Sequence, residues 1–513
     1  MKQKKPEKAK GLSRRDFMKA TGGATALAGI AASGLFLGSS EASATELPRK
    51  WDETVDVLIV GSGFAGLAAA AEAAGAGAKV VILEKMPTYG GNSIINGGVY
   101  ASWDDKYHLR QKLNLGDDSP ELHKQDTLKG GDFYGIPELV DVFVKGATPA
   151  LNWMIDEGGC QLREALTRAG GHSAYRTHTT TAGVGRGYTE PLKKIAIKRG
   201  AKIRLGTEVT WIWRENEKSP VLGVEVKKGR KKRNIKVKKG LILASGGFSR
   251  DIKMRQAFNP SIVPEINCTN HPGATGEIIR YAQAIGADTL HMAFIQLYPF
   301  AEPETGILDT PAVYPFNGVG YGLVYVSKLG KRFVNELERR DVCSYAQIKL
   351  GLKPTFSIFN EEMVLKMGGA KEEIEKGLAR KRFVTANTIG ELGEKLDIPA
   401  DSLKRTIRSH NGYIREGKDP DFNKPMTKNM IPLVKGPFYG IAQWPAVHHC
   451  MGGLRINKDA QVIDIWGKPI PGLYAAGEVT GGIHGSNRLG SNAIPDCVVF
   501  GRIAGINAAK MRS

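Results

Sequence analysis

The chain alternates short apolar runs with helix-patterned stretches, which is typical of an α/β fold. Residues 55–60 form one such run, an alanine-rich stretch follows, and a second run lies at 80–83. Continuous apolar runs of this length predict strands that are buried on both faces, as in a parallel sheet. A further run at 240–244 leads into Gly246 and Gly247 and predicts another strand that ends in a glycine turn.

The pattern changes in the second half of the chain. Charged stretches at 360–381 and 388–418 predict long surface helices, and apolar, glycine-rich sequence returns only at about residue 446. This order predicts one domain that is interrupted by a second. The predicted parts are residues 52–299 and 446–513 for the first domain and residues 300–445 for the inserted one.

Residues 1–44 predict an export signal that is not part of the fold. A basic start leads to Ser13-Arg14-Arg15-Asp16-Phe17, then to a mildly apolar stretch ending near Leu37, and Ala42-Ser43-Ala44 is typical of a cleavage site. Together these features indicate a twin-arginine signal. A transmembrane anchor is the alternative, and the short, weakly hydrophobic stretch argues against it. We therefore expect a periplasmic protein whose mature chain begins near residues 43–45.

Length and cysteine content narrow the class of protein. Removal of the signal from the 513 residues leaves enough chain for two or three globular units. No other apolar run approaches the length of a membrane span. The five cysteines show neither CxxC nor CxxCH spacing, so the sequence supports no metal site, no attached haem and no disulfide framework.

A basic cluster lies at 227–239. The formal net charge is +20, and nine of these thirteen residues are Lys or Arg. Nucleic acid is an improbable partner in the periplasm, and the pattern predicts a hairpin between 221–226 and 235–244. A solvated hairpin is the favoured interpretation, and a docking patch for an acidic cytochrome is the alternative.

Two glycine-rich motifs indicate a bound dinucleotide. Gly61-Ser-Gly63-Phe-Ala-Gly66 follows the first predicted strand and opens a helix, whose N-terminus can hold a pyrophosphate. Glu84 follows the next strand, where it can contact a ribose hydroxyl. The glycine-dense loop 472–490 carries Glu478 and Arg488, and such a loop lets backbone approach a flat cofactor. The guanidinium of Arg488 can bind a carboxylate through two parallel hydrogen bonds.

In these motifs the chain resembles the fumarate reductase and succinate dehydrogenase flavoprotein family, especially its soluble periplasmic branch of flavocytochrome c fumarate reductases and urocanate reductases. The matching motifs span about residues 52–510. The resemblance implies a Rossmann-like FAD-binding domain with an inserted α+β capping domain.

The loop 90–98 resembles the second flavin loop of the family, and because it lacks the histidine that membrane-bound relatives link to flavin, we expect FAD to be bound non-covalently. Because the chain has no haem motif, the resemblance also implies a separate electron donor such as a c-type cytochrome. The cofactor contacts implied are Gly61, Gly63, Phe64, Ala65, Gly66, Glu84, Lys85, Gly91, Asn92, Ser93, Gly97, Gly98, Gly246, Gly247, Gly477, Glu478, Ser491, Ala493 and Ile494.

The resemblance also implies catalytic residues. The family's reaction adds a hydride from flavin N5 to one alkene carbon and a proton to the other, while cations hold the carboxylate. His448 and Arg488 align with the carboxylate-binding residues, and Arg340 aligns with the proton donor. Arg339 is the alternative donor if the alignment is shifted by one position. For each residue the ordinary alternative is a salt bridge or a core histidine.

The departures from the family pattern concern the substrate. Relatives that reduce fumarate have a histidine where this chain has Tyr298, which resembles the urocanate reductase branch. The stretch 306–318 retains Thr310 as a possible part of the second carboxylate clamp but lacks the Glu and Arg of the fumarate pattern. A second buried carboxylate without cationic partners is costly. We therefore predict a substrate with one carboxylate and an aryl, imidazolyl or alkyl group.

The sequence thus predicts a periplasmic FAD-dependent reductase of an α,β-unsaturated carboxylate. Fumarate reductase is the alternative within the same class of reaction. An oxygen-using oxidase of amines or steroids and a non-catalytic electron carrier are the alternatives from other classes. The implied trio Arg340, His448 and Arg488 argues against the oxidase, and Arg340, the implied proton donor, argues against the electron carrier.

Overall fold

The computed structural model describes residues 47–309, 314, 318–366 and 371–511. The predicted export signal at 1–44 lies outside these residues, and so does Thr310. Everything that follows concerns the described part of the chain.

A large, mainly parallel sheet forms the centre of the first domain. Strand β1 (Glu53–Val60) lies between β2 (Val80–Leu83) and β9 (Lys231–Leu243) and is parallel to both. Val60 is level with Leu83 on one side and with Leu243 on the other, so the three strands end together. The whole order is β17-β18-β9-β1-β2-β6, with β7 and β8 attached beside β9. This sheet confirms the predicted α/β class. The remaining strands are β6 (Lys202–Arg204), β7 (Glu208–Arg214), β8 (Val221–Lys228), β17 (Gln461–Ile463) and β18 (Pro469–Ala475).

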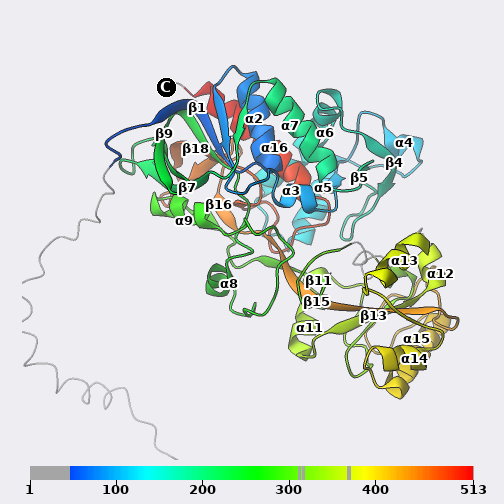
Figure 1. The fold of residues 1–513 in the computed structure, drawn as a ribbon. Coiled ribbons are helices and arrows are strands. Elements are labelled where there is room, and N and C mark those ends of the chain that lie inside the picture. The colour runs from blue at the N-terminus through cyan, green and yellow to red at the C-terminus, as the bar shows by residue number, and fades with distance from the viewer. Residues whose placement is uncertain (1–46, 310–313, 315–317, 367–370, 512–513) are drawn as a thin grey trace, which may run out of the picture. The chain divides into compact units, whose positions relative to one another are not determined.

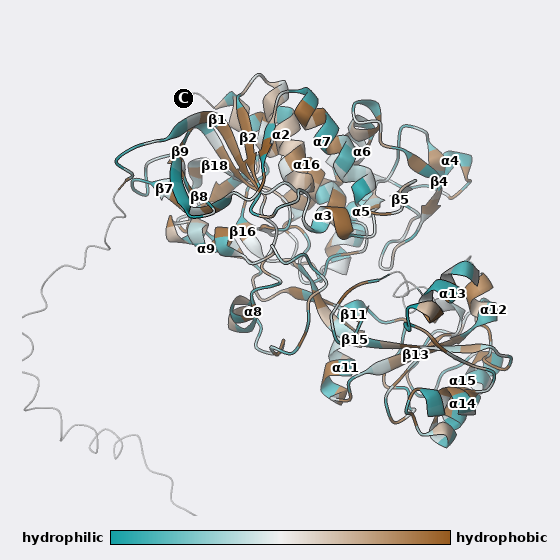
Figure 2. Cartoon of the chain, viewed as in Figure 1, coloured by the Kyte–Doolittle hydropathy of each residue, from teal (hydrophilic) through white to brown (hydrophobic). Residues whose placement is uncertain are grey.

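The C-terminal segment completes this domain. Strand β18 pairs in parallel with β9, and helix α16 (Ala493–Lys510) packs against α2 (Phe64–Gly75) and β9 (Figure 1). Close packing of the two helices needs Gly505, because an added Cβ there would lie 2.3 Å from the carbonyl oxygen of Ala69. The strands β1 and β2 are strongly hydrophobic, as Figure 2 shows, and their buried side chains form the main core with those of α2.

The other elements of this domain surround the sheet. Two small sheets have the orders β3-β5-β4 and β10-β16-β19. The strands are β3 (Val99–Ala101), β4 (Leu162–Thr167), β5 (Thr177–Thr180), β10 (Thr289–Leu290), β16 (Gly453–Arg455) and β19 (Thr480–Gly481). The helices are α3 (Asn92–Ile95), α4 (Leu109–Lys112), α5 (Pro120–Gly130), α6 (Pro137–Asp156), α7 (Arg186–Lys198), α8 (Ile252–Phe258) and α9 (Glu277–Ala284).

The inserted part is built on an antiparallel sheet with the order β11-β15-β13-β12 and β14 beside β15. Its two long strands contribute to both hydrophobic cores: Leu297 and Val447 belong to the main core, whereas Phe300 and Ile441 belong to the core of the inserted part. The predicted boundaries at 299/300 and 445/446 fall within these strands and stay predictions. The elements are β11 (Ile295–Ala301), η2 (Val319–Tyr321), β12 (Val324–Val326), α11 (Arg340–Leu350), β13 (Thr355–Asn360), α12 (Glu361–Lys366), α13 (Lys371–Ala379), β14 (Val384–Ala386), α14 (Ile389–Lys395), α15 (Ala400–Glu416) and β15 (Phe438–Cys450).

The prediction of one helix over 388–418 is wrong. Helix α14 ends at Lys395 and α15 begins at Ala400. Between them Asp397 has a φ of 57°, and Pro399 precedes the first residue of α15. Proline lacks the amide that would continue the hydrogen-bond ladder and restricts the residue before it, so the chain turns at this point.

The basic cluster forms the predicted hairpin. Strands β8 and β9 are antiparallel, and Lys228 pairs with Lys231 beside the turn. Strand β9 has 13 residues, which at about 3.3 Å per residue is about 40 Å from the turn to its other end at Leu243. The solvated hairpin and the docking patch for a cytochrome both stay predictions.

Within the described residues, no helix is both long enough and apolar enough to cross a membrane. The five cysteines are free thiols, and four of them are buried.

Candidate active site

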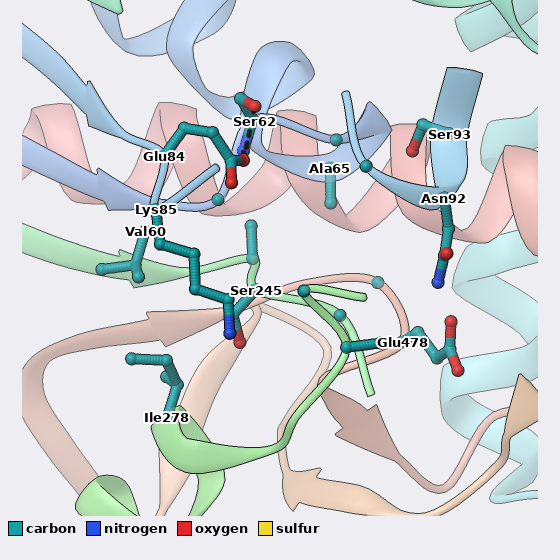
Figure 3. A pocket seen from close by; sticks show the side chains of 18 of the residues that line it. Val60, Ser62, Ala65, Glu84, Lys85, Asn92, Ser93, Ser245, Ile278 and Glu478 are labelled. Carbon is teal, nitrogen blue, oxygen red and sulfur yellow. Dashed lines mark hydrogen bonds between the residues drawn. The ribbon is translucent and has the colours of Figure 1, made fainter. Parts of the chain in front are cut away.

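A pocket opens where strands β1, β2 and β9 end. Figure 3 shows Glu84 and Lys85 at one side of it and Asn92 and Glu478 at the other. The predicted cofactor residues that line it are Gly61, Gly63, Phe64, Ala65, Glu84, Lys85, Gly91, Asn92, Ser93, Gly246, Gly477 and Glu478. The carboxyl ends of parallel strands are where open α/β sheets bind ligands.

Glycine is required where the chain makes its close approaches. Gly61 has a φ of 104°, and an added Cβ there would lie 2.3 Å from the carbonyl oxygen of Ala244. By contrast, Gly91 and Gly246 also have positive φ, but an added Cβ would meet nothing within 4 Å. These two glycines therefore face open space in the pocket, which fits a large flat ligand lying against the backbone.

Glu84 is held rigidly at its end of the pocket. Its carboxylate accepts hydrogen bonds from the Ser62 amide at 3.1 Å, from the Ser62 hydroxyl at 2.6 Å and from the Met86 amide at 3.0 Å. Lys85 donates to the Thr275 hydroxyl at 2.6 Å and pairs with Glu277. Glu277 was not predicted from the sequence, because it reaches the pocket from a segment 192 positions after Lys85.

The other predicted cofactor residues are not among those that line the pocket. Gly66 packs against the carbonyl of Gly61, Gly98 approaches Val184, and Gly247 approaches Glu478. The Ser491 hydroxyl lies 2.9 Å from that of Thr177. The rest are Gly97, in the loop after α3, and Ala493 and Ile494, in the first turn of α16.

Arg488 is a buried cation that donates hydrogen bonds to neutral groups. It is 7% exposed, and its Nη2 donates to Gln296 Oε1 at 2.8 Å while Nη1 donates to the Leu489 carbonyl at 3.2 Å. Its Nε has no hydrogen-bond partner among the described residues. Burial, and after it the charge of Arg340, lowers the pKa of Arg488 to about 9. A buried cation without a hydrogen-bonded anion is costly, so this geometry fits an anionic ligand.

Gln296 is a residue that the sequence analysis missed. Besides accepting from Arg488, its amide donates to Asn487 Oδ1 at 2.7 Å and to the Arg488 carbonyl at 2.8 Å. It therefore holds both the side chain and the backbone of Arg488. The available signal was its position two residues before Tyr298, because alternate residues of a strand share one face.

His448 and Tyr298 lie on the neighbouring strands β15 and β11, with ring centroids 5.0 Å apart. His448 Nδ1 lies 2.8 Å from the Thr269 hydroxyl. Burial lowers the pKa of His448 well below its ordinary value, and the charges of Arg488 and Arg340 lower it further, so the ring is neutral near pH 7. Burial raises the pKa of Tyr298, so its hydroxyl is neutral as well.

Arg340 is the first residue of α11, and its guanidinium carbon lies 5.1 Å from the centroid of the Tyr298 ring. Its Nη2 lies 3.6 Å from the place that a Cβ on Gly490 would occupy. Burial lowers the pKa of Arg340. Arg339 instead donates to Asp132 at 2.6 Å and to Asp341 at 2.7 Å. The structure therefore brings Arg340, and not Arg339, together with Tyr298.

A second buried group of titratable residues lies beside Glu478. Burial raises the pKa of Glu478 to about 7. Its Oε1 accepts from the Cys450 amide at 2.9 Å, and its Oε2 lies 3.7 Å from His449 Nδ1. His484 stacks edge-on against His449 and contacts Asp496 at 3.1 Å. Glu478 was predicted only as a cofactor residue, and its contact with His449 was not predicted from the sequence.

Comparison with known proteins agrees with the geometry. Residues 56–494 match the family described as FAD binding domain. The chain is 37% identical over 508 residues to the acrylate reductase flavoprotein subunit of Shewanella woodyi, covering 96% of this chain and 97% of that protein. This chain belongs to the fumarate reductase and succinate dehydrogenase flavoprotein family. The flavoprotein is also 37% identical to the urocanate reductase of Eggerthella lenta over 483 residues, with 92% and 77% covered.

A solved structure shows the same fold. The open conformation of a flavocytochrome c3 fumarate reductase matches with a TM-score of 0.77 and 31% identity, over 99% of this chain and 83% of that one. These findings confirm FAD as the cofactor and the class of the protein, a flavoprotein oxidoreductase resembling fumarate reductase. The residues of the pocket lined by Gly61, Glu84, Gly246 and Glu478 are of the kinds that could hold FAD.

We expect acid precipitation to release the FAD into the supernatant. The loop 90–98 has no histidine, and His271, which lines the pocket, is close to Glu84 and Lys85. The measurement is flavin fluorescence in the supernatant and on the washed, denatured polypeptide. Fluorescence that stays on the polypeptide would contradict non-covalent binding, and a His271→Ala variant would then show whether His271 is the point of attachment.

Proposed function

We propose that this flavoprotein reduces the C=C bond of an α,β-unsaturated carboxylate whose other end is an aryl, imidazolyl or alkyl group. The observation that carries the proposal is Arg488, a buried cation whose Nε has no hydrogen-bond partner in the described part of the chain. It belongs to one cluster with Arg340, His448 and Tyr298, as their mutual effects on pKa and their ring contacts indicate.

Each residue of the cluster has a distinct role in this proposal. FAD supplies the hydride when it is bound. Arg488 binds the substrate carboxylate and neutral His448 adds a hydrogen bond, so that the alkene is held and polarised. Arg340 donates the proton to the second alkene carbon. Its lowered pKa makes this donation easier than it is for an exposed arginine.

Tyr298 sets the proposed substrate class. A phenol can stack on a ring and donate a hydrogen bond, but it carries no positive charge at neutral pH with which to hold a second carboxylate. Two relatives are named for acrylate and urocanate, acids that have a single carboxylate. Fumarate reductase is the alternative, favoured by the fumarate reductase of matching structure.

A substrate screen tests the proposal. The FAD-loaded protein, with reduced viologen as electron donor, is assayed against acrylate, methacrylate, cinnamates, urocanate and fumarate. The expected result is a higher kcat/KM for at least one monocarboxylate than for fumarate. A far higher kcat/KM for fumarate would make the alternative correct. Turnover with none of them, together with oxygen consumption on amines or steroids, would support the oxidase interpretation instead.

We further propose that the protein works in the periplasm after export on the signal at 1–44, with electrons from a separate c-type cytochrome. Support comes from the twin-arginine motif at 14–15 and from the absence of a haem-attachment motif in the sequence. N-terminal sequencing of the periplasmic protein is expected to begin within residues 43–45. An Arg14→Lys, Arg15→Lys variant is expected to remain in the cytoplasm, and normal export of that variant would contradict this route.

We expect Tyr298→His to lower activity on the native substrate and to raise fumarate turnover only slightly, because the Glu and Arg of the fumarate pattern are still missing. Tyr298→Phe keeps the ring beneath Arg340. It is expected to lower kcat/KM by an amount equivalent to about 0.5–1.5 kcal/mol, the contribution of one neutral hydrogen bond. The two variants together separate stacking from hydrogen bonding. A Tyr298→His enzyme that turns over fumarate efficiently would show that Tyr298 alone excludes the second carboxylate.

A further inference from the structure

Arg339 joins the inserted part to the loop after α5. Its Nη1 donates to Asp132 Oδ1 at 2.6 Å, while its Nε and Nη2 donate to the two oxygens of Asp341 at 3.1 and 2.7 Å. Arg339 directly precedes Arg340 and occupies the N-cap position of α11. Its position is therefore coupled to that of Arg340 through one peptide bond.

The loop that carries Asp132 is fixed to the segment that carries Arg488. The Ser486 amide donates to the Gly131 carbonyl at 3.0 Å, and the Asn487 side chain donates to the Gly130 carbonyl at 3.0 Å. The Ser486 hydroxyl also donates to Asp132. A short chain of contacts thus connects the Arg488 segment, through Asp132 and Arg339, to Arg340.

The backbone of this loop is strained. Asp132 and Phe133 are consecutive non-glycine residues with φ of 53° and 62°. Phe133 is 73% exposed, so burial of its ring does not offset the strain. Left-handed backbone is uncommon for a bulky residue, and such strain persists where surrounding contacts hold it, often at functional sites. Here the contact of Asp132 with Arg339 is one of those that hold it.

We propose that Asp132 and Arg339 are positioning residues, an ion-pair latch that holds Arg340 at the correct place relative to the Arg488 segment. This inference rests on the proposed function in one respect, the role of Arg340 as proton donor. The latch is partly exposed, at 38% for Arg339 and 44% for Asp132. Salt therefore weakens it, and its effect on catalysis is moderate.

A double-mutant cycle tests the latch. Asp132→Asn removes the charge, and asparagine tolerates left-handed backbone. Arg339→Gln removes the partner. Each single variant is expected to lower kcat about three- to tenfold with little change in KM, and the double variant is expected to be no slower than the worse single one. Arg339→Lys is expected to retain most of the activity. The matched control is Arg280→Gln, which breaks the exposed ion pair with Asp251 and is expected to leave kcat unchanged.

Hydrogen exchange supplies a readout that does not depend on turnover. In the FAD-loaded enzyme the backbone amides of α11 are expected to exchange faster in Asp132→Asn and Arg339→Gln than in the unmutated protein. Their exchange rates are expected to be unchanged in Arg280→Gln. Failure of the substrate screen would refute the proposed function, whereas the hydrogen-exchange measurement would still test the latch. Unchanged exchange in α11, or losses in kcat that simply add in the double variant, would overturn the latch.

Discussion

Replacing Arg340 by alanine is expected to lower kcat by about 10²- to 10⁴-fold, the usual contribution of general acid catalysis, while FAD content stays normal. Arg340 is not among the residues that line the FAD pocket, and its guanidinium lies against Tyr298 instead. Only the protonation step should be lost. The measurements are kcat on the best substrate from the screen and the flavin absorbance per polypeptide.

The neighbouring arginine is the internal control. Arg339→Ala removes a side chain that pairs with Asp132 and Asp341, and its effect is expected to stay within about tenfold, as for a partly exposed ion pair. Full activity in Arg340→Ala together with a loss of several orders of magnitude in Arg339→Ala would show that Arg339 is the donor.

Replacing Arg488 by glutamine is expected to lower kcat/KM for the carboxylate substrate by an amount equivalent to about 2–5 kcal/mol of transition-state stabilisation. This is the usual cost of removing one partner of a buried charged contact. Arg488 is 7% exposed and donates to Gln296. Gln296→Leu is the matched control, because it leaves the charge in place and loses only the residue that orients it. Its loss is expected to be smaller. An Arg488→Gln enzyme with unchanged kcat/KM would exclude Arg488 from substrate binding.

The pH profile gives an independent test of Arg488. Its pKa is lowered to about 9, with burial as the main cause and Arg340 next. Arginine is a cation below its pKa, so the charge that binds the carboxylate is present at neutral pH and is lost as pH rises through about 9. The substrate carboxylate stays anionic over this range. We therefore expect kcat/KM to fall above about pH 9 in the unmutated enzyme and this fall to be absent in Arg488→Gln. A profile that is flat through about pH 10 would contradict the assignment.

Local patterns in the sequence were sufficient for the class of fold and for the cofactor. The mostly apolar runs 55–60, 80–83 and 240–244 became β1, β2 and the end of β9, because a strand that is apolar on both faces is buried on both faces in a parallel sheet. The motif Gly61–Gly66 marked the turn into α2 through the spacing of its glycines, and Gly66 packs against the carbonyl of Gly61 within the motif itself. Such information is contained within a few adjacent positions.

Other features depend on residues far apart in the chain, and only the tertiary structure decided them. Arg339 and Arg340 are the same residue type in the same charged stretch. They differ because Asp132, 207 positions earlier, pairs with one, while Tyr298 lies beneath the other. Likewise Gln296 orients Arg488 across 192 positions. The sequence by itself thus determined an FAD-binding α/β flavoprotein, whereas the different partners of Arg339 and Arg340 and those of the buried Arg488 depended on long-range packing, which no local pattern records.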